Sequence, residues 1–172
     1  TRNVAHRAHF HIQMEALRLT AADGLYISPV IGPKKPDDFL AEPIMQSYQL
    51  LMEFGEYPIG KAVLGSFATY PRYAGPREAV FTALCRKNMG CSHFIIGRDH
   101  TGVGDFYPLD ANRRLFEDLG DIGIEPVFFP EIGYDSTEEA YRAARDGEQL
   151  ESISGTRVRE LLGQGERLPS WF

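Results

Sequence analysis

The feature that most constrains the fold is a regular alternation of short apolar runs with longer amphipathic segments. The apolar runs, such as residues 25–30 and 93–96, are continuous rather than alternating in polarity. Strands of this kind are typical of parallel sheets that are covered on both faces. Gly, Pro or Asp residues separate the runs from the amphipathic segments. The pattern therefore predicts an α/β fold with a mostly parallel sheet and helices on both of its faces.

The same periodicities place the individual elements. Strands are expected over residues 25–30, 62–65, 93–96 and 126–129. Helices are expected over residues 5–22, 43–54, 76–88, 112–119, 138–145 and 156–162. No internal repeat or linker marks a second domain, so residues 1–172 are expected to form one domain.

Composition excludes several classes of protein. With 172 residues, 43% of them hydrophobic, the chain can bury a substantial core. The 18 basic residues against 24 acidic ones give a net charge of -6, which disfavours a broad nucleic-acid interface. No apolar stretch reaches the roughly 20 residues that a membrane span needs. Only Cys85 and Cys91 occur, without zinc-ligand spacing, which favours a cytoplasmic protein.

The first polar cluster comprises residues 1–9, which run into the first expected helix. His6 and His9 lie three residues apart, so both imidazoles face one side of the first turn, close to backbone N–H groups that favour an anion. The preceding Thr-Arg-Asn adds a hydroxyl, a guanidinium and an amide. This combination predicts a polyphosphate site. Two alternatives stay open here: two solvated histidines, or a zinc site that also recruits His11.

A glycine-rich segment, residues 97–104, follows directly after the strand expected at residues 93–96. Ligands of open parallel sheets bind beyond the carboxyl ends of the strands. Glycines let the backbone approach a ligand, Arg98 can bind phosphoryl oxygens with two hydrogen bonds, and His100 can donate to a developing negative charge. Asp99 is equally suited to holding Arg98 or capping the turn.

Two further segments place arginines at the start of expected helices. Residues 71–78 carry two arginines around a Gly-Pro turn, although Arg77 and Glu78 are equally compatible with ordinary surface charges. Residues 153–159 put small hydroxyl residues at a helix N-terminus, with two arginines close behind. That arrangement favours a second anion site.

Taken together, these motifs resemble the catalytic domain of the ATP-sulfurylase (sulfate adenylyltransferase) family. They are Thr-Arg-Asn-x-x-His-Arg-Ala-His from residue 1, Arg-Tyr-Ala-Gly-Pro-Arg-Glu from residue 72, Gly-Cys-x-His-Phe-Ile-x-Gly-Arg-Asp-His from residue 90, Ile-Ser-Gly-Thr-x-x-Arg from residue 153, and the terminal Trp171-Phe172. The resemblance covers nearly the whole chain, in the family's order. It implies a Rossmann-like nucleotidyltransferase fold in which sulfate attacks the α-phosphorus of MgATP, giving adenylyl sulfate and pyrophosphate.

The resemblance also implies roles for individual residues. The implied catalytic residues are Thr1, Arg2, Asn3, His6 and His9. The implied nucleotide-binding residues are Gly97, Arg98, Asp99, His100, Ile132, Ser154, Thr156 and Arg159, with Ile132 at a position that touches adenine. Sulfate would bind to Arg2 and to the backbone amide of Thr101. Mg²⁺ is implied only as the companion of ATP, with no metal site on the protein itself.

The chain departs from the family pattern at several positions. Val4, Phe10, Pro71 and Thr101 stand where the family has Pro, Glu, Met and Ala. The Thr101 hydroxyl is expected to crowd or retune the sulfate pocket. Two rival functions remain: a related H-x-x-H nucleotidyltransferase with another acceptor, and a non-catalytic nucleotide-binding domain.

The resemblance implies a larger assembly as well. A Rossmann-like motif needs a strand that delivers Thr1-Arg2-Asn3, so the chain is expected to be part of a longer enzyme. The family implies a homo-oligomer that works with, or is fused to, an adenylyl-sulfate kinase. Seven of the 18 basic residues lie in the four motif segments, which predicts a basic cleft for small anions on an acidic protein. They are Arg2, Arg7, Arg72, Arg77, Arg98, Arg157 and Arg159.

Overall fold

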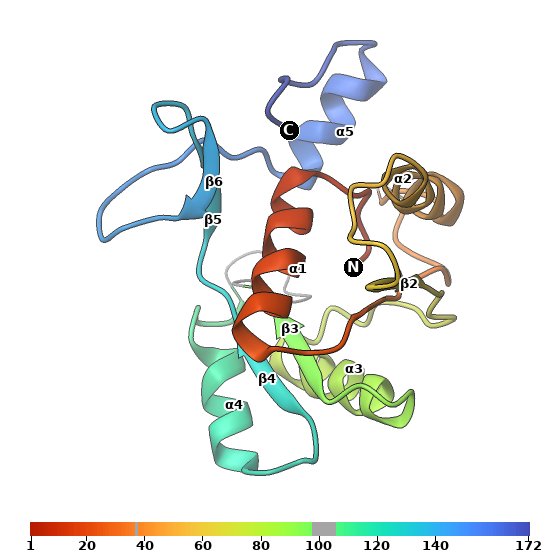
Figure 1. Cartoon of the computed structure of the whole chain (residues 1–172), viewed down its shortest axis with the longest axis vertical. Coiled ribbons are helices and arrows are strands. Elements are labelled where there is room, and N and C mark those ends of the chain that lie inside the picture. The colour runs from red at the N-terminus through yellow and green to blue at the C-terminus, as the bar shows by residue number, and fades with distance from the viewer. Residues whose placement is uncertain (37, 98–105) are drawn as a thin grey trace. The chain divides into compact units, whose positions relative to one another are not determined.

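A computed structural model describes residues 1–36, 38–97 and 106–172 (Figure 1). The chain divides into two compact units, one made of Thr1–Tyr70 with Ile132–Phe172 and the other of Pro71–Glu131. Each unit has a hydrophobic core of its own.

The first unit is built around a strand–helix–strand motif. β1 (Leu25–Ile27) and β2 (Ala62–Leu64) run parallel, with Leu25 opposite Ala62, and α2 (Ala41–Glu53) connects them. α1 (Arg7–Thr20) precedes β1 and ends where Ala21 adopts a left-handed conformation, just before Asp23-Gly24. The core of this motif consists of Ile27, Ile44, Tyr48 and Tyr57.

The C-terminal part of the chain completes the first unit. β5 (Ile132–Asp135) and β6 (Ala140–Ala143) form an antiparallel hairpin that contacts α1. α5 (Gly155–Gly163) follows and buries Val158 and Leu161. The last two residues, Trp171 and Phe172, return to the start of α1, where the Arg7 N–H donates to the Phe172 carbonyl oxygen at 3.2 Å.

The second unit repeats the parallel arrangement. β3 (His93–Ile96) and β4 (Glu125–Phe128) are parallel neighbours, connected through α4 (Ala111–Leu119). α3 (Pro76–Asn88) packs against α4 and β3. Its N-cap, Gly75, has a φ of 54°, and a Cβ there would lie 2.5 Å from the Tyr107 ring, so only glycine fits this close turn. The core residues of the second unit are Ala79, Ala83, Ile96, Phe116 and Ile124.

The structure confirms the α/β class and the parallel strand pairs. Five of the six expected helices and all four expected strands are present, with small shifts of their ends. The strand expected over residues 25–30 loses regular pairing after Ile27 and resumes as one parallel bridge between Val30 and Phe67.

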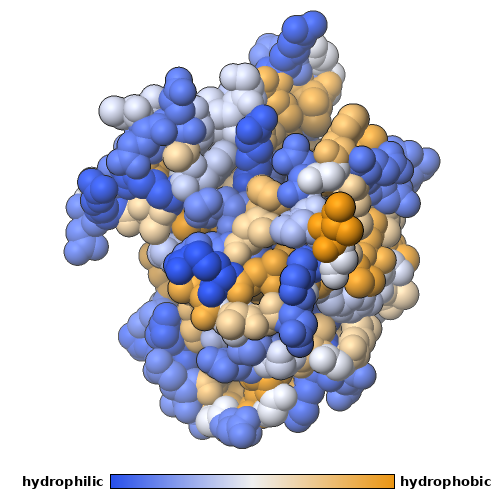
Figure 2. Space-filling view, viewed as in Figure 1, coloured by the Kyte–Doolittle hydropathy of each residue, from blue (hydrophilic) through white to orange (hydrophobic). Residues whose placement is uncertain are grey.

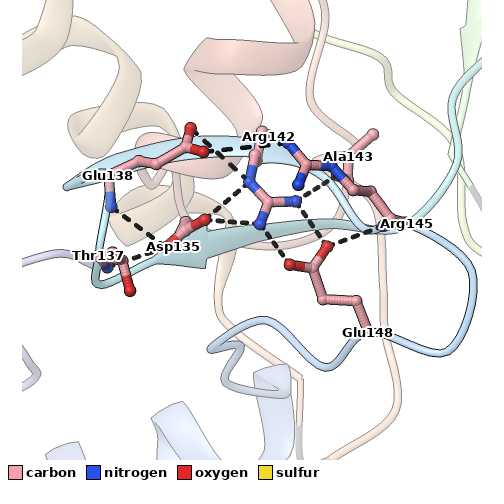
Figure 3. A network of polar contacts seen from close by, with 7 residues as sticks. All are labelled: Asp135, Thr137, Glu138, Arg142, Ala143, Arg145 and Glu148. Carbon is pink, nitrogen blue, oxygen red and sulfur yellow. Dashed lines mark hydrogen bonds and ion pairs between the residues drawn. The ribbon is translucent and has the colours of Figure 1, made fainter.

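The helix expected over residues 138–145 is wrong, because this segment contains β6. Alternating Ala and charged residues suit a helix, but tertiary contacts override that local preference. Tyr141 pairs with Tyr134 across the hairpin, and Arg142 forms ion pairs with Asp135 and Glu148 (Figure 3). The Asp135 carboxylate also accepts the N–H groups of Thr137 and Glu138, which shapes the turn between the strands.

Ile132 is the first residue of β5 and pairs with Ala143. Its segment, Pro-Glu-Ile-Gly, carries loop-forming residues. Pairing with β6 gives the backbone of this segment a hydrogen-bonding partner that the sequence pattern does not reveal.

The surface mixes polar and apolar side chains, as the face shown in Figure 2 illustrates. Isolated exposed apolar residues such as Phe54 are normal on folded proteins. Within the described parts of the chain, no helix combines the length and the apolar character needed to cross a bilayer.

Candidate functional site

The N-terminal segment is fixed by backbone hydrogen bonds on both sides. The Val30 N–H donates to the Thr1 carbonyl oxygen at 2.8 Å, which places the segment beside the continuation of β1. The Asn3 N–H donates to the Thr1 hydroxyl at 3.2 Å, and the Ala5 N–H donates to the Ser47 hydroxyl of α2 at 2.8 Å. The backbone that carries Arg2 and Asn3 is thus held on the β1–α2 scaffold.

The imidazole rings of His6 and His9 lie close together at the start of α1, tilted by 36°. His6 is the N-cap of the helix, and the centroids of the two rings are 3.8 Å apart. The Nδ1 atoms of both are buried and have no hydrogen-bond partner in the part of the chain that the structure describes. Buried polar atoms without partners are rare in folded proteins and point to an external ligand.

Burial also fixes the charge of the two imidazoles. It lowers the pKa of His6 to about 4. Burial, followed by repulsion from His6, holds the pKa of His9 well below its usual range. Both rings are therefore neutral at pH 7, where each offers one N–H donor and one acceptor nitrogen.

The first turn of α1 has two unused N–H donors. The Arg7 N–H is taken by Phe172 and the Phe10 N–H by the His6 carbonyl oxygen. The N–H groups of Ala8 and His9 have no acceptor among residues 1–36, 38–97 and 106–172. No acidic side chain lies in this turn. The helix dipole and these donors together favour an anion.

A second helix N-terminus lies next to the first. Ser154 is the N-cap of α5, and its hydroxyl accepts the Arg157 N–H at 3.2 Å. An ideal Cβ built on Gly155 would lie 3.4 Å from the Asn3 side-chain oxygen and 3.4 Å from a guanidinium nitrogen of Arg159. The segment before α1 and the start of α5 therefore meet at Gly155.

Arg159 is held in place by its neighbours. Its guanidinium donates to the Thr156 hydroxyl at 3.2 Å, lies 3.9 Å from the Asp38 carboxylate, and sits 5.7 Å from the centre of the Phe39 ring. The side chain is about one-fifth exposed, at 20%. This leaves a positioned cation at the start of α5.

A small pocket joins these elements. It is an open hollow of about 240 Å³, a volume that includes solvent space at its mouth, and both His6 and Gly155 line it. The other lining residues are Asn3, Val4, Phe39, Ile153, Val158 and Phe172. Polar groups near the starts of α1 and α5 thus converge on one small hollow together with several apolar side chains.

The structure brings some of the expected site residues together. Asn3 and His6 line the pocket, the His9 ring contacts the His6 ring, and Arg159 flanks Gly155. The hydroxyls of Ser154 and Thr156 are engaged within α5.

Other expected site residues lie apart from this pocket. Ile132, at the start of β5, is not one of its lining residues as far as the described chain extends. Thr1 is exposed, and the Nη1 atom of Arg2 is buried.

The remaining expected residues belong to the second unit. Gly97 directly follows β3, and a Cβ at this position would meet no atom of the described residues within 4 Å. Arg98, Asp99, His100 and Thr101 lie outside the described residues. No cluster of three or more His, Cys, Asp or Glu residues suited to a metal occurs in the described ranges.

Glu78 is not an ordinary surface charge, because it is buried. Its carboxylate accepts the N–H groups of Arg72 and Ala74 and so fixes the loop before α3. Arg77 is exposed, as a surface charge would be. The guanidinium of Arg72 lies 4.5 Å from the centre of the Phe81 ring.

Sequence reasoning missed the apolar walls of the pocket. Phe39 comes from the loop before α2, and Phe172 reaches His6 from the opposite end of the chain. In the sequence, Phe172 stands out only as part of a family-like motif. No local pattern predicts a contact between residues 6 and 172.

The comparisons with known proteins agree with the sequence resemblance. A family model described as ATP-sulfurylase matches residues 1–172. The sulfate adenylyltransferase of Symbiobacterium thermophilum is 46% identical over 179 aligned positions, covering 100% of this chain and 44% of the relative. Those of Cenarchaeum symbiosum and Pyrococcus abyssi are 42% and 41% identical, covering 96% and 100% of this chain. The chain spans less than half the length of these relatives.

A solved structure shares the fold. A hexameric APS kinase from Thiobacillus denitrificans superposes with a TM-score of 0.70 at 19% sequence identity. The match covers 99% of this chain and 32% of the other. At this identity the similarity concerns the fold alone.

Proposed function

The chain belongs to the ATP-sulfurylase family, and from this premise we propose that it forms the catalytic part of a sulfate adenylyltransferase. The reaction transfers the adenylyl group of MgATP to sulfate. A sulfate oxygen forms a bond to the α-phosphorus while the bond from that phosphorus to the pyrophosphate oxygen breaks. Adenylyl sulfate and pyrophosphate are the products, and Mg²⁺ enters with ATP as part of the substrate.

The chemistry asks the protein mainly for positioning and charge stabilisation. Sulfate is already an anion, so no general base is needed, but two repelling anions must be held in line. Negative charge builds up on the α-phosphoryl group and on the leaving pyrophosphate. Positive groups and N–H donors that are in position before the reaction starts lower the free-energy cost of placing negative charge on these two groups.

The observation that carries the proposal is the convergence of His6, Asn3 and the start of α5 on one pocket. His6 and His9, with the unused N–H donors of the α1 first turn, hold the β- and γ-phosphoryl groups as pyrophosphate leaves. Because both imidazoles are neutral, they act as hydrogen-bond donors rather than as charges. Asn3 supports the phosphoryl oxygens.

The other roles follow the family resemblance. Arg2 binds sulfate and stabilises the transition state, with Thr1 beside it. Gly97, Arg98, Asp99 and His100 line the nucleotide, the Thr101 amide contacts sulfate, and Ile132 contacts adenine. Ser154, Thr156 and Arg159 complete the nucleotide site from α5. Of these, Arg159 has support from its fixed position beside Gly155.

The wider setting is proposed on the same basis. The protein works as a homo-oligomer together with, or fused to, an adenylyl-sulfate kinase, and it resides in the cytoplasm. The first point follows the family resemblance, and the free state of Cys85 and Cys91 accords with the second.

The test is the acceptor dependence of pyrophosphate release by the intact protein. We expect release from MgATP that requires sulfate and that selenate or molybdate also supports. Release that another acceptor stimulates, with sulfate having no effect, would instead indicate a related nucleotidyltransferase. Calorimetric binding of ATP without any turnover would indicate a non-catalytic domain. Either result would overturn the proposal.

A further inference from the structure

We propose that Phe172 is a positioning residue that holds the His6 imidazole in the anion site, and that the β5–β6 hairpin fixes Phe172 in turn through Trp171. The role in catalysis rests on the proposed function above, whereas the positioning of His6 can be measured without it. The residues come from three places far apart in the sequence: residue 6, residues 134–141 and residues 171–172.

Phe172 contacts the start of α1 in two ways. Its ring stacks on the His6 ring, with centroids 4.7 Å apart and an interplanar angle of 27°. Its carbonyl oxygen accepts the Arg7 N–H at 3.2 Å. The carbonyl satisfies the first orphan donor of the helix, and the ring covers one face of the imidazole.

His6 consequently contacts two rings. The centroid of the tilted His9 ring lies 3.8 Å from that of His6, and the Phe172 ring stacks on His6 at 4.7 Å. His6 makes no side-chain capping bond to the helix, and its Nδ1 atom has no partner in the described ranges. Ring contacts rather than hydrogen bonds therefore set the orientation of this imidazole in the absence of a ligand.

Trp171 connects Phe172 to the hairpin. Its ring stacks on Tyr134 of β5, with centroids 5.5 Å apart and an interplanar angle of 7°. The Tyr141 hydroxyl of β6 donates to the Trp171 carbonyl oxygen at 2.6 Å. Burial raises the pKa of Tyr141 to about 12, so this hydroxyl keeps its proton at neutral pH.

Polar contacts of one arginine also connect the two strands of the hairpin with the loop that follows them. Arg142 bonds Asp135 on the facing strand and Glu148 in the following loop (Figure 3). Tyr134 and Tyr141 are register partners between the two strands. The hairpin thus contacts Trp171 through Tyr134 and Tyr141. These contacts fix the residue that directly precedes Phe172.

The experiment compares substitutions at Phe172 in the intact protein. Phe172→Ala removes the ring, Phe172→Tyr keeps it, and Tyr141→Phe removes only the hydroxyl bond to Trp171. Phe54→Ala, the same truncation at an exposed site of the same unit, is the matched control. The readouts are the His6 pKa by NMR titration, the binding of inorganic pyrophosphate by calorimetry, and KM and kcat for ATP formation from adenylyl sulfate and pyrophosphate.

We expect Phe172→Ala to raise the His6 pKa from about 4 toward its ordinary value of 6.5, because water reaches the uncovered ring. The Kd and KM for pyrophosphate rise by about tenfold, as expected when a binding group loses its fixed geometry. Phe172→Tyr restores both values, Tyr141→Phe shifts them less in the same direction, and Phe54→Ala changes neither.

The proposal is overturned if Phe172→Ala leaves the His6 pKa and the pyrophosphate Kd at the wild-type values, or if Phe172→Tyr fails to restore them. If Phe172→Ala does not fold, the His6 pKa and the pyrophosphate Kd of Tyr141→Phe test the proposal instead. This variant removes only a hydroxyl group and leaves every carbon atom in place. An inactive wild-type protein would refute the proposed function alone, since the titration and pyrophosphate binding still report on Phe172.

Discussion

At the scale of single residues, His6 is both the N-cap of α1 and a member of the proposed anion site. These two roles make opposite demands on the first turn of the helix. An N-cap residue usually satisfies the first turn with a side-chain oxygen, but the His6 side chain makes no such bond. Its place in the cap leaves the N–H donors of Ala8 and His9 without acceptors in the described chain. The residue thus gives up local helix stability in favour of an open anion site.

The lowered pKa of His6 predicts how stability depends on pH. The folded-state pKa is about 4 against 6.5 in the unfolded chain, so the unfolded state binds more protons between these values. The contribution of His6 is complete above pH 6.5 and is lost as the pH falls toward 4. Its upper size is roughly 3 kcal/mol.

The measurement is urea unfolding at pH 7 and pH 4.5, read through hydrogen exchange of the α1 amides. The free energy of unfolding falls less on acidification in His6→Gln than in the wild type. His11→Gln, on the same helix, serves as the control. Equal pH dependence of wild type and His6→Gln would contradict the assignment of a buried, neutral His6.

At the scale of elements, the start of α5 should separate stability from anion binding. Ser154 accepts the Arg157 N–H, so Ser154→Ala is expected to lower the free energy of unfolding by about 1 kcal/mol. Ser154→Asp keeps an N-cap acceptor but adds a negative charge beside the pocket. It therefore retains stability while weakening the binding of pyrophosphate.

Thermal unfolding and pyrophosphate calorimetry of both variants check this expectation. If Ser154→Asp binds pyrophosphate as tightly as the wild type does, the start of α5 is not part of the anion site.

The elements differ in how far the sequence could predict them. β1, α2 and β2 carry their own signals, because continuous apolar runs and amphipathic periodicity follow from local burial. The helix predicted over residues 138–145 is wrong, because this segment contains β6 and its Tyr141 and Arg142 make their decisive contacts with Trp171 and Glu148. Both partners lie outside the segment, so these contacts leave no periodic pattern in its sequence.

The candidate site likewise contains residues that could be predicted from the sequence and residues that could not. The paired histidines and the hydroxyl-rich start of α5 could be singled out from residue type and spacing alone. The walls contributed by Phe39 and Phe172 could not, because apolar residues have many equally suitable partners in a fold. The roles of Arg98, Asp99, His100 and Thr101 stay predictions, since these residues lie outside the described chain.

At the scale of the whole molecule, a net charge of -6 accompanies the proposed anion site. The structure explains part of this through the use of its arginines. Arg142 and Arg157 are neutralised by nearby carboxylates, in the hairpin and on α5 respectively. Arg159 also has a carboxylate nearby, that of Asp38 at 3.9 Å, but its guanidinium flanks Gly155 at the pocket. An acidic protein with a few directed cations attracts small anions without a broad affinity for polyanions.

The most direct test of the anion site is sulfate-dependent exchange of labelled pyrophosphate into ATP by the intact protein and two site variants. We predict exchange in the wild type and near-normal exchange in His11→Ala. In Arg2→Ala and His9→Ala we predict a loss of about a hundredfold or more, which is the scale for removing one charge-stabilising donor. Near-normal exchange in Arg2→Ala and His9→Ala would contradict the assignment of the α1 start as the site where pyrophosphate leaves.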